Sequence, residues 1–92
     1  MAKEKGFYDN QPSDGDRIAL IHSELSEALE WIRHGNKPDD KIPEFTGAEA
    51  ELADAVIRIM DYSASKGWRL AEAIVAKMHF NSTRPRLHGK KF

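Results

Sequence analysis

Glu24-Leu-Ser-Glu27 and Glu51-Leu-Ala-Asp54 decide this fold, because each places two carboxylates inside a segment with helical apolar spacing. Residues three apart on an α-helix lie on one face, about one turn from each other, so each stretch directs its two carboxylates the same way. If the two helices pack side by side with these faces together, four carboxylates meet in one pocket. Nearby carboxylates repel one another, so such a pocket requires a neutralising cation.

Carboxylate oxygens are hard ligands, which favour magnesium, manganese or calcium over zinc or copper. A di-iron carboxylate bundle uses Glu-x-x-His pairs on two helices, and no glutamate here has a histidine three residues later. Magnesium is therefore the favoured ion, with manganese as a possible substitute. Bound magnesium keeps positions open for water and phosphate oxygens, so the predicted chemistry is attack of an activated water on a phosphoryl group.

Helix signals surround both acidic stretches. The first predicted helix runs roughly from Asp16 to His34, with Asp14, Gly15 and Asp16 supplying the N-cap and Gly35 closing it. Residues 36–45 have loop composition.

Thr46 opens the second predicted helix with a capping box completed by Glu49, and Gly67 ends it. Its apolar positions cover more than a narrow stripe, which predicts a central, largely buried helix: Leu52, Ala53, Val56, Ile57, Ile59, Met60 and Ala64. A third helix is predicted from about Trp68 to Ser82 or Thr83, ending before Pro85.

The 92 residues are predicted to form one all-α domain: an N-terminal segment (1–13), a helical core (14–83) and a basic tail (84–92). Three main helices per chain bury little surface alone, so we expect self-association into a four-helix-bundle-like homodimer or a homotetramer. The chain has no cysteine and no apolar run of about 20 residues, which predicts a cytoplasmic protein without a membrane partner.

No acidic residue follows Glu72, whereas the end of the chain is basic. Lys77, Asn81 and Arg84 are spaced four and three apart, so they share a face if the third helix persists. An ammonium, an amide and a guanidinium together can grip a chain of phosphates. A basic helix end that complements the helix dipole is the alternative, and spacing alone does not separate the two.

Several neighbours of the acidic stretches have open or supporting roles. Arg58 and Asp61 are interpreted as ion-pair or supporting residues rather than ligands, and Glu30 as either. Phe7 and Trp31 are candidates to stack on a nucleobase, although a core or interface role is favoured for both.

The two acidic stretches, with helix–loop–helix between them, resemble the signature of the MazG-like all-α nucleoside triphosphate pyrophosphohydrolases, relatives of the dimeric dUTPases. The likeness extends through Lys77-Met-His-Phe-Asn81-Ser-Thr-Arg84-Pro and the final His88-Gly-Lys-Lys-Phe92, and so covers nearly the whole chain.

The resemblance implies magnesium-dependent hydrolysis of a nucleoside triphosphate, often a deoxynucleotide, to the monophosphate and pyrophosphate. By this likeness the metal ligands would be Glu24, Glu27, Glu51 and Asp54, and Glu27 or a neighbour would orient the attacking water. Phosphate binding would fall to Lys77, Asn81 and Arg84. Family members assemble as dimers or tetramers.

Two other hypotheses remain open. One is a helical dimerisation module whose basic tail binds nucleic acid; we consider this the weaker reading. The other is a nucleotide sensor that keeps the pocket but does not turn over.

Overall fold

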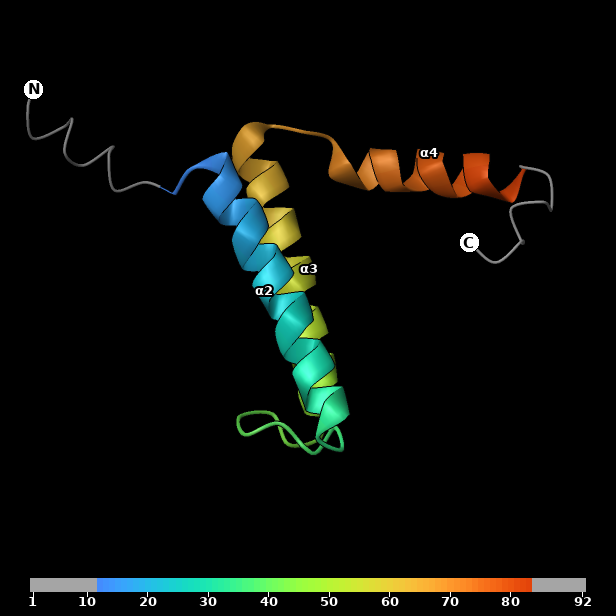
Figure 1. Ribbon diagram of the computed structural model, residues 1–92. Coiled ribbons are helices and arrows are strands. Elements are labelled where there is room, and N and C mark those ends of the chain that lie inside the picture. Colours follow the sequence, from blue (N-terminus) through green and yellow to red (C-terminus); the bar gives the residue numbers. More distant parts are fainter. Residues whose placement is uncertain (1–11, 84–92) are drawn as a thin grey trace, which may run out of the picture. The chain divides into compact units, whose positions relative to one another are not determined.

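The structure is a computed structural model that describes residues 12–83. This part of the chain forms three α-helices and no strand: α2 (Asp14–Arg33), α3 (Gly47–Lys66) and α4 (Leu70–Ser82) (Figure 1). The predicted all-α fold is therefore confirmed at this level. No helix within the described range is both long and apolar enough to cross a lipid bilayer.

Ser13 starts α2. Its hydroxyl accepts a hydrogen bond from the Asp16 amide at 3.0 Å, and the Asp16 carboxylate accepts one from the Ser13 amide at 3.2 Å. This reciprocal capping box places the helix start two residues before the predicted Asp16, because the serine oxygen satisfies an amide of the first turn. At the other end, Gly35 adopts a left-handed φ of 95°, as the C′ glycine prediction requires.

The connection between α2 and α3 is held by its own polar groups. The Asp39 carboxylate accepts hydrogen bonds from the amides of Lys41 and Ile42 at 2.8 and 3.1 Å. The Asn36 side-chain oxygen accepts a hydrogen bond from the Ala48 amide at 2.9 Å, which satisfies an amide in the first turn of α3. These bonds fix the connection that brings α3 back alongside α2.

The predicted capping box of α3 is confirmed. The Thr46 amide donates to Glu49 Oε1 at 2.8 Å, and the Glu49 amide donates to Thr46 Oγ1 at 3.2 Å. The helix ends at Lys66, and Gly67 follows with a φ of 74°.

α2 and α3 lie side by side and run antiparallel (Figure 1). Three contacts between the helices show this direction: Arg17 with Tyr62, Glu24 with Arg58, and Trp31 with Glu51. Later residues of α2 contact earlier residues of α3, as antiparallel helices require. The three α2 residues are seven apart, which keeps them on one face of the helix. This helix pair carries the candidate site.

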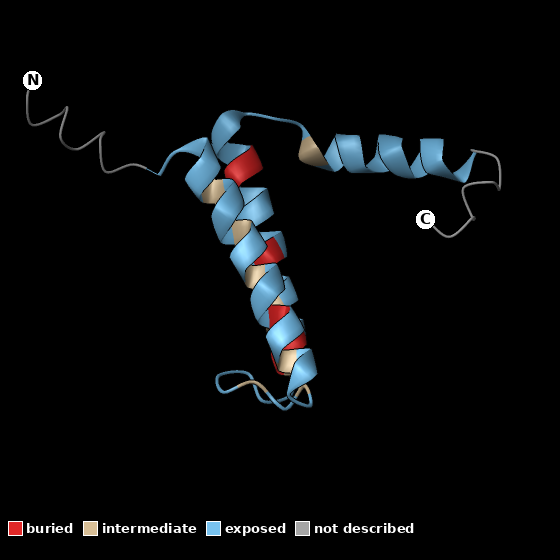
Figure 2. Ribbon diagram, viewed as in Figure 1, coloured by how far each residue is buried: buried red, intermediate tan, exposed pale blue. Residues whose placement is uncertain are grey.

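The seam between α2 and α3 is narrow and built mostly from small side chains. Ala48, Ala55 and Tyr62 are buried at seven-residue steps along α3, and Ala28 is the buried residue of α2 (Figure 2). Small residues at a contact let two helices approach closely.

The prediction that α3 is largely buried is wrong for the described chain. Its large apolar residues are mostly half exposed: Leu52 48%, Val56 53%, Ile57 52%, Ile59 37% and Met60 55%. The reason is that the alanine seam, rather than the large apolar face, meets α2.

The chain divides between Tyr62 and Ser63 into two compact units. α4 belongs to the second unit and is described here by itself. None of its residues is buried, and its N-cap, Arg69, makes no side-chain capping bond. The helix begins two residues after the predicted Trp68 and ends at Ser82, as expected.

Candidate metal centre

Glu24, Glu51 and Asp54 bring their carboxylates together across the α2–α3 seam. One oxygen from each lies within 4.8 Å of the other two. We refer to these three residues as the acidic triad. Ligand oxygens on one magnesium ion are separated by about 3 to 4 Å, so small side-chain movements would let all three share an ion. The donor set, consisting of carboxylate oxygens alone, fits a hard divalent cation.

Glu24 contacts the arginine at position 58. Arg58 Nε donates to Glu24 Oε2 at 2.7 Å, and the Glu24 side chain is only 13% exposed whereas that of Arg58 is 43% exposed. This charge-assisted hydrogen bond is the main cause that lowers the pKa of Glu24, against the opposing effect of burial. The interpretation of Arg58 as an ion-pair residue is thus confirmed.

Glu51 is shifted in the opposite direction. Burial is the largest cause that raises its pKa, and hydrogen bonding with Glu24 raises it further. The pKa values of the two neighbouring carboxyl groups therefore move in opposite directions. Glu24 keeps its negative charge, whereas Glu51 holds a proton more readily. A cation in the triad would favour the ionised form of both.

Trp31 supports Glu51 from across the seam. Its indole Nε1 donates to Glu51 Oε2 at 3.3 Å, which partly offsets the rise in the pKa of Glu51. The Trp31 ring packs on Gly47: a Cβ added there would fall 1.8 Å from Cδ2 and 2.1 Å from Cε2 of the indole. Trp31 is half-buried and lies against Gly47 of α3, in keeping with the core or interface role favoured for it.

The link between Trp31 and the triad was not predicted from the sequence. The available signal was its position seven residues after Glu24, which keeps the indole on the face of α2 that carries the carboxylate. What the sequence lacks is the close approach at Gly47, where the missing side chain admits the ring.

Glu27 is not part of the triad. It is exposed, although its negative charge is close enough to contribute to the raised pKa of Glu51. Of the four predicted ligands, the structure therefore brings three together and leaves Glu27 beside them.

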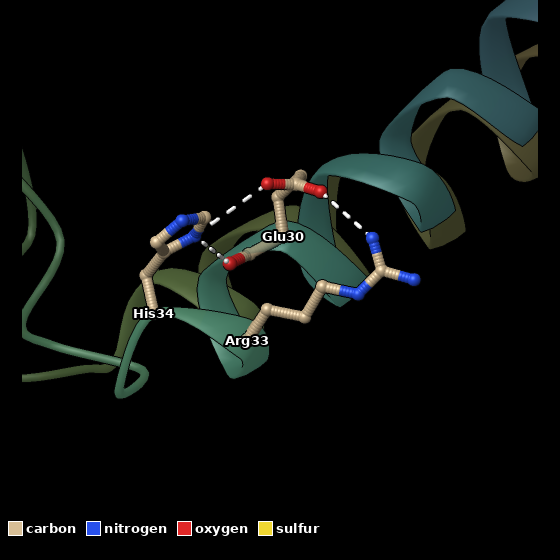
Figure 3. Close-up of polar contacts among 3 residues, drawn as sticks. All are labelled: Glu30, Arg33 and His34. Carbon is tan, nitrogen blue, oxygen red and sulfur yellow. Dashed lines mark hydrogen bonds and ion pairs between the residues drawn. The ribbon is translucent and has the colours of Figure 1, made fainter.

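Glu30 is not one of the triad and lies in the last turn of α2, where Figure 3 shows its polar contacts. Its carboxylate pairs with Arg33 Nη1 at 3.1 Å and with His34 Nδ1 at 3.5 Å. All three side chains are more than half exposed, so these pairs contribute little to stability. Between the two roles left open for Glu30, the structure shows a surface ion pair.

The predicted phosphate-binding residues are only partly described. Lys77 and Asn81 lie one turn apart on α4 and are exposed. Lys77 Nζ also lies 5.4 Å from the centroid of the Phe80 ring. Arg84 and Phe7 fall outside the described residues, so the phosphate-binding and base-stacking predictions for them stay predictions.

The arrangement on the α2–α3 pair is thus three converging carboxylates, with a guanidinium hydrogen-bonded to Glu24 and an indole N–H hydrogen-bonded to Glu51. Such a set can bind a divalent cation and leave coordination positions for water or phosphate oxygens. Comparison of the chain with protein-family models, with curated proteins and with solved structures found no match.

Proposed function

We propose that this protein is a magnesium-dependent nucleoside triphosphate pyrophosphohydrolase that releases the monophosphate and pyrophosphate. The observation that carries the proposal is the convergence of Glu24, Glu51 and Asp54 from two helices to within 4.8 Å.

The triad would hold Mg²⁺, or Mn²⁺ in its place. When bound, the ion supplies charge neutralisation for the phosphates and a water molecule of lowered pKa. Glu24 and Glu51 come from opposite helices, so they would hold the ion in the seam rather than on one helix surface.

Glu27 is assigned to the attacking water. It lies one turn from Glu24 on α2, is exposed, and is close enough to affect Glu51 electrostatically. A carboxylate in this position can accept a proton from a water molecule while the triad keeps the cation. Because Glu27 is not among the three converging carboxylates, it suits the role of a base better than that of a fourth ligand.

Lys77 and Asn81, with Arg84, are proposed to bind the phosphate chain. The exposed positions of Lys77 and Asn81 on one side of α4 support this role. The large apolar residues left exposed on α3 support the further proposal that the chain works as a homodimer or homotetramer, because burying such a face is favourable by about 25 cal/mol per Å².

The decisive experiment incubates the protein with a panel of ribo- and deoxynucleoside triphosphates and magnesium, and resolves the products. We expect monophosphate and pyrophosphate from at least one substrate, and loss of turnover in Asp54→Asn with helicity retained. Orthophosphate and diphosphate as products would instead indicate a different phosphohydrolase. Tight binding of a nonhydrolysable analogue without turnover of any triphosphate would indicate the sensor.

A further inference from the structure

A cavity of about 270 Å³ lies on the α2–α3 pair and is connected to the acidic triad through Arg58. It is lined by Pro12, Arg17, Leu20, Arg58 and Asp61. We call it the arginine cavity. Arg58 belongs to both places, because it lines the cavity and also donates to Glu24 at 2.7 Å.

We infer that the arginine cavity is a binding subsite for a tetrahedral oxyanion such as a phosphate group, and that cation binding at the triad opens it by releasing Arg58 from Glu24. The inference rests on the proposed cation site. It assigns a role to two arginines that the proposed reaction does not otherwise use.

The first step is competition for Glu24. A divalent ion binds a carboxylate oxygen at about 2 Å, and would stand within about 5 Å of a guanidinium that is hydrogen-bonded to the same carboxylate. Two cations at that separation repel in a partly buried site. Arg58 is 43% exposed and has a long side chain, so it can leave Glu24 without unfolding either helix.

The second step is the charge balance of the cavity. While Arg58 neutralises Glu24, the remaining charges on the wall, Arg17 and Asp61, cancel. Once a cation replaces Arg58 at Glu24, the cavity holds two guanidinium groups against one carboxylate. It then has an excess positive charge, which favours an anion.

The third step is geometry. The Arg17 guanidinium carbon lies 5.3 Å from the centroid of the Tyr62 ring, which is 9% exposed. A guanidinium has five N–H donors, so Arg17 can contact an oxyanion in addition to its other partners. Arginine forks match the oxygens of phosphate and sulfate well.

The test measures free Mn²⁺ by electron paramagnetic resonance during titration of the full chain, with and without sulfate at constant ionic strength. Sulfate serves as the probe because it has tetrahedral geometry and binds Mn²⁺ weakly. In the unsubstituted protein we expect sulfate to increase the Mn²⁺ affinity about fivefold or more, because a ligand at one of two coupled sites typically changes the affinity of the other by at least about this factor.

Two substitutions distinguish release of Arg58 from Glu24 on cation binding from a role of Arg58 in supporting the cation site. Arg58→Gln should bind Mn²⁺ as tightly as the unsubstituted protein, or more tightly, and should lose the sulfate effect. Arg17→Gln should keep the Mn²⁺ affinity within about twofold and also lose the sulfate effect. The matched control is Arg33→Gln, which removes an arginine paired only with Glu30 in the described structure and should leave both quantities unchanged.

Weaker Mn²⁺ binding in Arg58→Gln would overturn the inference, because it would show that Arg58 supports the cation site. A sulfate effect that survives in Arg17→Gln would overturn it as well, and this variant decides the matter if circular dichroism shows that Arg58→Gln does not fold. Mn²⁺ binding without any sulfate effect sinks the subsite alone. A protein that binds no Mn²⁺ sinks the proposed function with it.

A competition experiment distinguishes the two sources of the anion, a phosphate of the proposed substrate and free phosphate. If the cavity takes a phosphate of the proposed substrate, sulfate will compete with a nonhydrolysable nucleoside triphosphate analogue in the presence of Mn²⁺. If it takes free phosphate, sulfate and the analogue will bind together. Either result requires Arg17, so the Arg17→Gln variant must lose the sulfate response in both cases.

Discussion

Trp31 donates its indole N–H to Glu51 across the α2–α3 seam at 3.3 Å, and so connects the core of the helix pair to its acidic triad. The bond matters because Glu51 is the triad member whose pKa is raised, and the indole is the contact that opposes this rise. The packing of the helix pair and the pKa of Glu51 therefore depend on the same side chain.

Replacing Trp31 with phenylalanine tests this connection. Trp31→Phe keeps an aromatic ring near Gly47 but removes the N–H, so the pKa of Glu51 should rise further and cation binding should require a higher pH. Loss of one hydrogen bond should also cost about 1 kcal/mol of stability. The measurement is Mn²⁺ affinity between pH 5 and 8 beside urea unfolding. Trp68→Phe, on the other compact unit, is the control, and an unshifted pH profile in Trp31→Phe would contradict the prediction.

Glu51→Gln should stabilise the protein at neutral pH while it weakens cation binding. A carboxyl group whose pKa is raised by folding destabilises the folded state above that pKa, and this penalty disappears as the pH falls below its ordinary, unfolded value. Glutamine keeps an oxygen for Trp31 and removes the charge. The thermal midpoint of Glu51→Gln should therefore exceed that of the unsubstituted protein at pH 7, with the difference shrinking in acid.

Glu24→Gln should behave in the opposite way. The pKa of Glu24 is lowered by Arg58, so ionised Glu24 stabilises the folded state above its unfolded pKa, and this contribution is lost as the pH falls through its lowered, folded value. Glu24→Gln should thus lower the thermal midpoint at pH 7 and have little effect in strong acid. Shifts of the same sign in Glu24→Gln and Glu51→Gln would refute this assignment.

Gly47→Ala should disrupt the seat of Trp31. An added methyl group would fall about 2 Å from three ring atoms, so either the indole or the start of α3 must move. Such overpacking typically costs about 1–3 kcal/mol. Gly15→Ala in α2 is a matched control, because the nearest atom there is Ser13 Oγ at 3.7 Å and alanine favours the helix by up to about 1 kcal/mol. Chemical unfolding of both variants gives the comparison.

Glu27→Gln and Glu30→Gln compare two exposed glutamates on α2 that are one turn apart. If Glu27 activates water, its substitution should lower turnover by about 10² or more, with a smaller effect on Mn²⁺ affinity. Glu30 pairs with Arg33 and His34 instead, so Glu30→Gln should leave turnover within about twofold and stability within about 0.5 kcal/mol. Equal turnover in the two variants would remove Glu27 from the proposed reaction.

The local signals in the sequence predicted the three helices and most of their ends. Thr46 with Glu49 marked the start of α3, and Gly35 and Gly67 marked two helix ends, because capping bonds and left-handed backbone depend on residues that are near in sequence. The start of α2 was missed by two residues because Ser13 competed with Asp14 and Asp16, which have similar capping chemistry.

The sequence alone also determined which acidic residues could share a helix face, since a three-residue step fixes this on any α-helix. Only the tertiary structure decided that Glu24, Glu51 and Asp54 meet while Glu27 stays outside, that Arg58 pairs with Glu24, and that the small residues of α3 form the seam. These outcomes depend on the rotation of each helix about its axis. This rotation is set by close packing between residues distant in the chain, such as Trp31 on Gly47. The apolar periodicity of the sequence does not predict it.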